Sequence, residues 1–182
     1  MTTHIALLRG VNVGNNALRM EHLREMLAGL GFADVRTYLQ SGNALFSAQG
    51  TPDSLAAAIE RAVSEATRLP VSVVVRTPAQ LKRVISANPF LKEAAGEAKA
   101  LHKTLHVTFL AGAAPKAGIA ALDKIQAGGD RWRVADAEVY LSCPNGYARS
   151  KLNNAALERS LGVRATTRNW NTVTALNAMS GG

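Results

Sequence analysis

The chain has 182 residues, 47% of them apolar, so it is long enough for one large domain or two small ones with a real core. The net charge of +8 and the pI of about 10.2 favour anionic partners, although solvated basic side chains alone would explain both values. The single cysteine, Cys143, excludes a disulfide framework and a cysteine-based metal site. No stretch approaches the roughly 18 apolar residues of a membrane span, and the N-terminus lacks the apolar region of a signal peptide, so we expect a cytoplasmic protein.

The first part of the chain predicts strands and helices in the order β-α-β-β-α-β, because short apolar or β-branched runs alternate with apolar residues spaced three and four apart. The predicted elements are a buried strand at 5–8, a helix at 20–30, strands at 35–40 and 44–47 with a turn at 41–43, a helix opened by Thr51 and Pro52, and a strand at 71–75. This order is typical of the split-βαβ, ferredoxin-like pattern.

Thr77 and Gln80 predict a capping box that opens a connecting helix, which ends near Pro89. Residues 93–99 read as either a short helix or a mobile linker. The same element order then returns as a strand at 105–110, a helix at 115–126, a hairpin of 132–135 and 138–141, a helix at 150–161, a strand at 163–168 and a last helix at 172–179, capped by Asn171 or Thr172.

The predicted fold is therefore α+β, with two ferredoxin-like units in tandem joined by a helical linker and followed by a C-terminal helix. We place the first unit at residues 1–77, the linker at 78–103, and the second unit with the last helix at 104–182. A two-unit chain of this length can exist as a monomer, and we expect one.

The loop at 9–16 is the first candidate ligand site, because glycines after a strand let backbone N–H groups approach a ligand. Its candidate residues are Arg9, Asn12 and Gly14. The spacing matches neither a dinucleotide-binding fingerprint nor a Walker loop. The alternative is a loop whose asparagines satisfy its own backbone. Asn43, in the turn that follows Gln40, becomes a candidate only if the fold brings that turn beside the loop.

Two further polar segments lie near the C-terminus. In residues 144–151, Arg149 and Lys151 flank the predicted start of a helix, a place that attracts anions. The alternative is that both point into water. In residues 166–172, Arg168 can grip a carboxylate or phosphate, Asn169 can read an amide or base edge, and Trp170 can stack on a ring. The alternative is a structural corner, with Trp170 packed as a plug and Arg168 paired with a buried acid.

The motifs resemble domain-of-unknown-function family 1697, a set of mostly bacterial proteins. The resemblance rests on residues 6–14, 30–32, 35–43, 88–90, 150–152 and 166–173. It implies an α+β fold with ferredoxin-like halves, and it implies no assigned activity and no catalytic residues. Family members often have glycine where this chain has Asn15 and Ala148.

Our leading hypothesis is a polar, cationic groove for an anionic ligand: a nucleotide, a phosphorylated metabolite or single-stranded nucleic acid. The RRM signature is absent, which disfavours that RNA-binding module. A second hypothesis is an enzyme acting on a phosphorylated or carboxylated small molecule, with only His4 or Glu21 as weak candidate bases. A third is that the motifs are purely structural and lock the two halves together. The sequence indicates no catalytic set, no metal site, no cofactor and no membrane partner.

Overall fold

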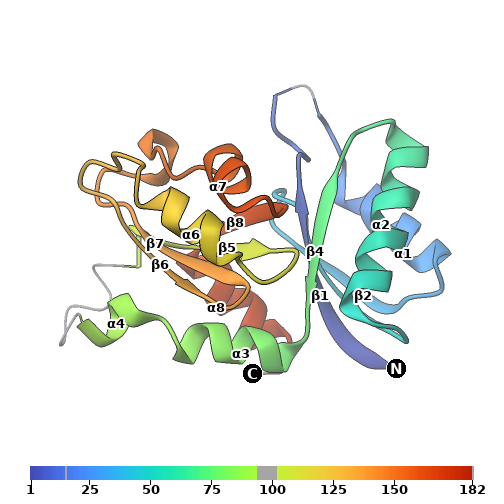
Figure 1. The fold of residues 1–182 in the computed structure, drawn as a ribbon. Helices are drawn as coiled ribbons and strands as arrows, with labels where there is room; N and C mark the ends of the chain where they lie inside the picture. The colour runs from blue at the N-terminus through green and yellow to red at the C-terminus, as the bar shows by residue number, and fades with distance from the viewer. Residues whose placement is uncertain (15, 94–101, 182) are drawn as a thin grey trace. The chain divides into compact units, whose positions relative to one another are not determined.

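The structure, a computed structural model, describes residues 1–14, 16–93 and 102–181, which separate into two compact units (Figure 1). The first unit is Met1–Lys82 with Leu176–Gly182, and the second is Arg83–Ala175. The unit boundaries fall within two helices, α3 (Pro78–Ser86) and α8 (Trp170–Met179). Most of the segment expected to be a short helix or linker lies outside the described residues. No helix among the described residues is long and apolar enough to cross a membrane.

The first unit contains a four-stranded antiparallel sheet in the order β2-β3-β1-β4, with two helices, α1 and α2. The elements are β1 (Thr2–Arg9), α1 (Met20–Gly29), β2 (Ala33–Tyr38), β3 (Asn43–Ala48), α2 (Pro52–Thr67) and β4 (Ser72–Arg76). The sequence predicted each of them within a few residues. Thr51 caps α2 by accepting a hydrogen bond from the Ser54 N–H, 3.2 Å away, which confirms the predicted helix start.

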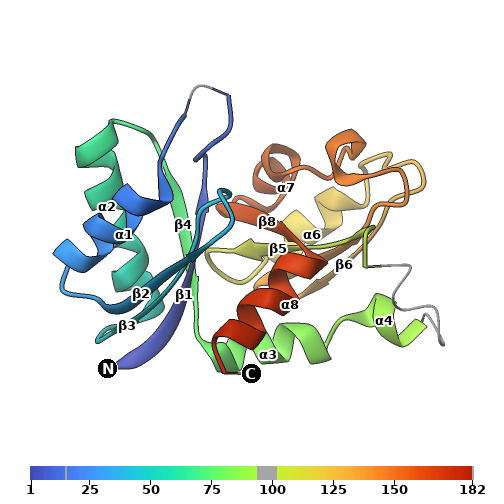
Figure 2. The same cartoon turned by 180° about the vertical axis from the view of Figure 1, so that it is seen from behind.

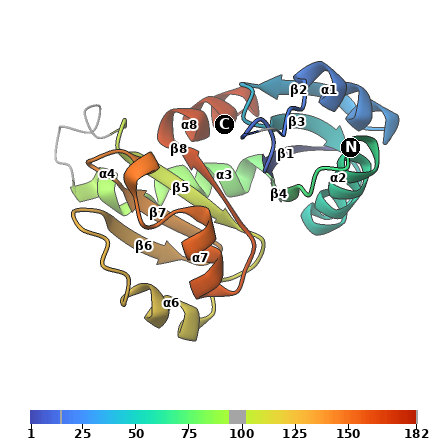
Figure 3. The same ribbon diagram turned by 90° about the horizontal axis from the view of Figure 1, so that it is seen from above.

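One face of this sheet packs against α1 and α2 (Figures 1 and 3). Alternate strand residues such as Ala6 and Phe46 face the helices, because successive side chains of a strand point to opposite sides. Leu23 of α1 and Ile59 of α2 are fully buried in the same core. The Phe46 ring also stacks on Phe32, with 4.6 Å between the ring centroids.

The second unit repeats this sheet, with antiparallel strands in the order β6-β7-β5-β8. Its elements include α4 (Pro89–Glu93), β5 (Leu105–Leu110), α6 (Lys116–Leu122), β6 (Arg131–Ala135), β7 (Glu138–Ser142), a 3₁₀ turn (Tyr147–Arg149), α7 (Asn154–Leu161) and β8 (Ala165–Asn169). The two sheets therefore have the same order when their strands are numbered within each unit. The chain is a mixed α+β protein with two four-stranded antiparallel sheets, as the sequence predicted at this level.

Helices α6 and α7 lie on the same side of the second sheet (Figures 1 and 2). Leu122 of α6 and Leu157 of α7 form a buried core with strand residues such as Leu141. The two helices approach closely at Gly118, where an added Cβ would lie 2.8 Å from the Cα of Leu161. On the opposite face, the Tyr140 hydroxyl donates a hydrogen bond to a carbonyl of α3, 3.0 Å away.

Three helix ends differ from those expected, and the differences shape the site. Helix α6 ends at Leu122 rather than 126, and a turn in which the Ile125 N–H donates to the Leu122 carbonyl follows it. Helix α7 begins at Asn154 rather than 150, because Asn153 supplies the cap by accepting from the Ala156 N–H. Helix α8 begins at Trp170 rather than 172.

Candidate functional site

In the first unit, the loop after β1 and the turn between β2 and β3 lie in contact. The Asn12 side chain donates hydrogen bonds to the carbonyls of Gln40, at 2.6 Å, and Leu18, at 2.8 Å. Its Oδ1 accepts from the Leu18 N–H at 2.8 Å. The turn also accepts from β1, because the Leu8 N–H donates to the Gly42 carbonyl at 2.8 Å. The two predicted motifs are thus neighbours, and the Asn12 side-chain amide links them through its hydrogen bonds to backbone groups.

The other first-unit candidates differ in their exposure. Asn43 is fully buried, and its amide donates to the Tyr38 carbonyl at 2.8 Å. It begins β3, so Leu39, with φ 58°, and Gly42, with φ 76°, supply the left-handed backbone of the turn. Gly14 is exposed, with φ 58°, and the Arg9 side chain is half-buried.

In the second unit, a hydroxyl cluster joins the two C-terminal motifs. The Tyr147 hydroxyl donates to Oγ1 of Thr167 at 3.1 Å, and Oγ1 of Thr167 donates to Oδ1 of Asn154 at 2.7 Å. Oγ1 of Thr108 lies 2.7 Å from the same Thr167 oxygen. The His106 ring stacks on Tyr147, with 4.9 Å between centroids. The segment before α7 is therefore tied to β8 through side chains that donate and accept in sequence.

The segment from β8 into α8 turns its larger side chains inward. Arg168 is 8% exposed, and its Nη1 donates to Oγ1 of Thr166 and to the Thr167 carbonyl, each at 2.9 Å. Burial lowers the pKa of the Arg168 guanidinium to about 10, while its interaction with Tyr147 acts in the opposite direction. Trp170 is only 1% exposed, so its ring presents no open stacking face.

Asn169 caps α8, although the sequence favoured Asn171 or Thr172 for this role. Its Oδ1 accepts a hydrogen bond from the Thr172 N–H at 2.8 Å. The strand β8 runs directly into α8 without a loop, so the last strand residue is also the cap of the helix. The amide oxygen of Asn169 is therefore committed to the backbone.

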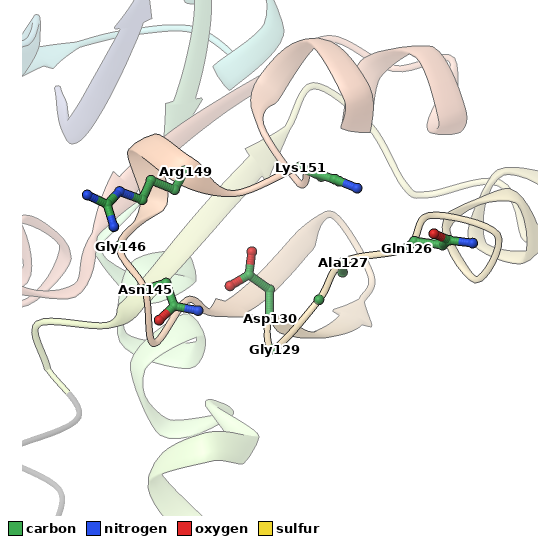
Figure 4. Close-up of a pocket in the computed structure, with 9 residues that line it drawn as sticks. Gln126, Ala127, Gly129, Asp130, Asn145, Gly146, Arg149 and Lys151 are labelled. Atoms are coloured by element: carbon green, nitrogen blue, oxygen red, sulfur yellow. The ribbon is translucent and has the colours of Figure 1, made fainter.

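A pocket of about 340 Å³ lies between the turn before β6 and the segment that precedes α7 (Figure 4). It contains Arg149 and Lys151, two of the residues that the sequence singled out. The lining residues are Gln126, Ala127, Gly128, Gly129, Asp130, Asn145, Gly146, Arg149 and Lys151. All of them belong to the second unit.

Local backbone structure fixes both walls of this pocket. One wall is a tight turn in which the Asp130 N–H donates to the Ala127 carbonyl at 3.1 Å, with Gly128 at φ 64°. The other wall passes through the 3₁₀ turn and then an extended stretch, where the Ser150 hydroxyl accepts from the Leu152 N–H at 3.0 Å. Because Ser150 is buried, its neighbours on either side in the chain project toward solvent.

The charges of the pocket are mixed. Arg149 and Lys151 are exposed, and the structure records no hydrogen bond or ion pair from either side chain to the residues it describes. Figure 4 shows the Asp130 carboxylate directed toward the stretch of chain that carries these two cations, whose side chains extend to either side. The amide of Asn145 lies near the same turn, because a Cβ added at Gly129 would be 3.9 Å from its nitrogen. The pocket thus offers two positive charges, one negative charge and amide groups that can both donate and accept.

Cys143 follows β7 directly and comes before this wall in the chain, and its thiol has low reactivity. Its side chain is fully buried, and burial raises the pKa of the thiol to about 11. The hydrogen bond with Ser150 acts in the opposite direction, and the charge of Asp130 adds to the rise. A thiol with this pKa is almost entirely protonated near neutral pH, so it does not act as a nucleophile.

The sequence predictions did not include the wall formed by residues 126–130. The Gly128–Gly129 pair was a visible turn signal, but it fell between the predicted helix at 115–126 and the predicted strand at 132–135 and was given no role. The pairing of β6 with β7 sets Arg131 opposite Ser142, which brings Asp130 next to the residues that follow β7. Combining that turn with the predicted hairpin would have indicated the pocket.

Comparison with solved structures finds a bacterial protein with the same fold. The conserved bacterial protein SP0830 from Streptococcus pneumoniae aligns with a TM-score of 0.75 at 19% identity, over 100% of this chain and 99% of the other, which shows a common fold. Protein BT0572 from Bacteroides thetaiotaomicron aligns with a TM-score of 0.22 at 8% identity, over 93% of this chain and 94% of the other.

No curated protein matches the sequence. The profile of the family described as "Protein of unknown function (DUF1697)" matches residues 1–140, a region that includes the turn at 126–130 and ends before Asn145. The resemblance seen in the sequence motifs is confirmed, and the chain belongs to the DUF1697 family.

Proposed function

We propose that this protein binds a small anionic ligand in the pocket of the second unit, through Arg149 and Lys151. The observation that carries the proposal is that two exposed cations line one cavity and have no recorded partner among the described residues. Arginine can hold a carboxylate or phosphate with two parallel hydrogen bonds, and lysine adds a mobile positive charge. Their exposed side chains reorient rapidly, so both can turn toward an anion that enters the pocket.

A phosphorylated metabolite fits this pocket better than single-stranded nucleic acid does. The volume of about 340 Å³ lies near the lower end of the roughly 300–1,000 Å³ typical of small-molecule sites. Binding of single strands generally combines a long basic track with exposed aromatic rings on which bases stack. No aromatic residue is among the described residues that line this pocket, and Trp170 is buried.

The proposal is tested by a thermal-shift and calorimetry series with inorganic phosphate, a sugar phosphate, AMP and a short oligonucleotide. We expect the sugar phosphate to stabilise the protein, and Arg149→Gln or Lys151→Gln to weaken its binding about tenfold, since a charge-assisted hydrogen bond contributes roughly 1.5–3 kcal/mol. The matched controls are Arg159→Gln and Lys116→Gln, which remove exposed cations outside the pocket.

If the pocket variants and the control variants lose the same amount of binding affinity, the effect comes from net charge alone, and the site is refuted. Absence of stabilisation by every phosphate probe would also refute it. Preferential binding of the oligonucleotide, with an affinity that falls steeply with salt, would support the nucleic-acid alternative instead.

For the segment at 166–172, we propose a structural role as the joint between β8 and α8. Its support is the burial of Trp170 and the capping of α8 by Asn169. We expect Trp170→Ala to lower the free energy of unfolding by about 3–5 kcal/mol, as for other large-to-small core changes. Trp170→Phe keeps most of the apolar volume and should cost much less. A Trp170→Phe protein that keeps its stability but loses phosphate binding would favour a ligand-binding role instead.

The enzyme hypothesis has less support. Of its candidate bases, His4 is 2% exposed in the first-unit core, and Glu21 is an exposed residue of α1 near Arg19. Neither residue lines the proposed pocket. We also infer that both units follow the ferredoxin-like arrangement, which their common strand order and their β-α-β-β-α-β succession support.

A further inference from the structure

We propose that the ligand of this pocket is a phosphorylated polyol, an anion that also carries hydroxyl groups able to donate hydrogen bonds to Asp130. This inference rests on the proposed function, because it assigns a ligand class to the same pocket. It starts from the carboxylate that stands in an otherwise cationic site.

The carboxylate of Asp130 makes the pocket a poor site for a bare anion. It is half-buried, and it lies beneath the stretch that carries Arg149 and Lys151 without a recorded ion pair to either (Figure 4). A phosphate held by the two cations therefore experiences repulsion from a nearby like charge. An ionised carboxylate only accepts hydrogen bonds, so a ligand uses it productively when it presents a donor.

The surrounding groups favour hydroxyl donors over an ammonium group. An ammonium would be attracted by Asp130 but repelled by Arg149 and Lys151, which leave the lining with one net positive charge. Hydroxyl groups are neutral and both donate and accept hydrogen bonds. The side-chain amides of Gln126 and Asn145, which also line the pocket, have the same two-way capacity.

The two walls of the pocket carry different charges, which predicts the orientation of the bound ligand. The wall that precedes α7 carries both cations, so it would receive the phosphate group. The turn at 126–130 carries the carboxylate and one amide, so it would receive the polyol. A compact phosphorylated sugar is of a suitable size for a pocket of about 340 Å³.

The decisive experiment compares glucose 6-phosphate with methyl phosphate, which has a similar charged group but no hydroxyl donors. Calorimetric titration of the wild-type chain should show glucose 6-phosphate binding about tenfold more tightly, since hydrogen bonds to a charged acceptor are among the strong ones. This comparison needs no variant, so it is independent of any folding defect.

Substitution Asp130→Asn then tests the carboxylate itself. It should tighten methyl phosphate binding several-fold, because a like charge is removed, and it should reduce the advantage of glucose 6-phosphate by about tenfold. The control Asp123→Asn changes an exposed carboxylate that does not line the pocket, and both affinities should stay within twofold of wild type.

The outcomes separate the two proposals. If neither phosphate ester binds the wild-type chain, the anion site itself is refuted. If the two esters bind equally, or if Asp130→Asn tightens both by the same factor, the anion site stands and the polyol inference is overturned.

Discussion

The hydroxyl of Tyr147 donates a hydrogen bond to Oγ1 of Thr167, 3.1 Å away, and this bond ties the turn beside the pocket to the last strand of the second sheet. The Thr167 hydroxyl also contacts Asn154 and Thr108, so this one group on β8 is linked to the 3₁₀ turn, α7 and β5. The side chains at the pocket rim, Arg149 and Lys151, follow this anchor directly in the chain.

Removing that hydroxyl with Thr167→Val should lower the free energy of unfolding by about 1–3 kcal/mol, because the polar partners around it lose their hydrogen bonds. Urea denaturation followed by circular dichroism measures the change. The control is Thr2→Val, at an exposed threonine of β1. Equal stability of the Thr167→Val and Thr2→Val proteins would show that the cluster contributes little.

Acid should destabilise the second unit through His106. Burial lowers the pKa of His106 below its ordinary value of 6.5, while a hydrogen bond to the Thr104 carbonyl acts the other way. The unfolded chain therefore binds more protons than the folded chain as the pH falls below 6.5, so stability is fully present above that pH and declines below it. Denaturation at pH 7.5 and 5.5 should show this loss.

The variant His106→Gln should reduce the difference between the two pH values. His4, whose pKa burial also lowers, contributes in the same direction and accounts for part of what remains. The exposed His22 supplies the control, and His22→Gln should keep the pH dependence of the wild type. An unchanged pH dependence in His106→Gln would assign the effect to other groups.

The close approach of α6 and α7 predicts that Gly118 does not tolerate a side chain. In Gly118→Ala the new methyl group would lie 2.8 Å from both the Cα of Leu161 and the carbonyl oxygen of Ser160. Both are backbone atoms, so the helices must separate, and overpacking of this kind typically costs about 1–3 kcal/mol.

Melting temperatures measure this cost, and Gly112→Ala is the matched control because an added Cβ there meets nothing within 4 Å. The alanine at 118 also gains up to about 1 kcal/mol of helix propensity, so a net loss of stability would be a stringent result. A Gly118→Ala protein as stable as the Gly112→Ala protein would refute the close contact.

The Cys143 thiol should resist alkylation in the folded protein. It is fully buried and its pKa is raised to about 11, so the reagent cannot reach the sulfur and little of the reactive thiolate is present. Mass spectrometry after iodoacetamide treatment at pH 8 should find little modification, whereas the same treatment in urea should modify the protein fully. Rapid labelling under native conditions would show that the pocket wall opens.

The sequence predicted most elements well because the local signals agreed with the tertiary context. Thr51 with Pro52, and Thr77 with Gln80, act as the caps that their spacing indicated. The sequence predicted helix starts least well where several neighbouring polar residues could cap the helix. Asn171 and Thr172 were the predicted caps, but α8 begins directly after β8, so Asn169 fills the role instead.

The candidate site was predictable in part. Arg149 and Lys151 were visible as cations in an unusual polar segment, and the structure places both on one pocket. The opposite wall follows from the β6–β7 hairpin, which the sequence predicted, together with the Gly128–Gly129 turn, to which no role was given. The burial of Trp170 was hidden, since an indole suits a core and a ligand site alike.

The unit boundary inside α8 has a consequence for biosynthesis. The first unit includes Leu176–Gly182, and the Arg36 guanidinium donates to the Met179 carbonyl at 3.1 Å. These residues leave the ribosome only after the whole second unit has been made. The N-terminal unit therefore stays incomplete until residues 176–182 have been synthesised. The second unit, Arg83–Ala175, is one continuous stretch and is complete before that point.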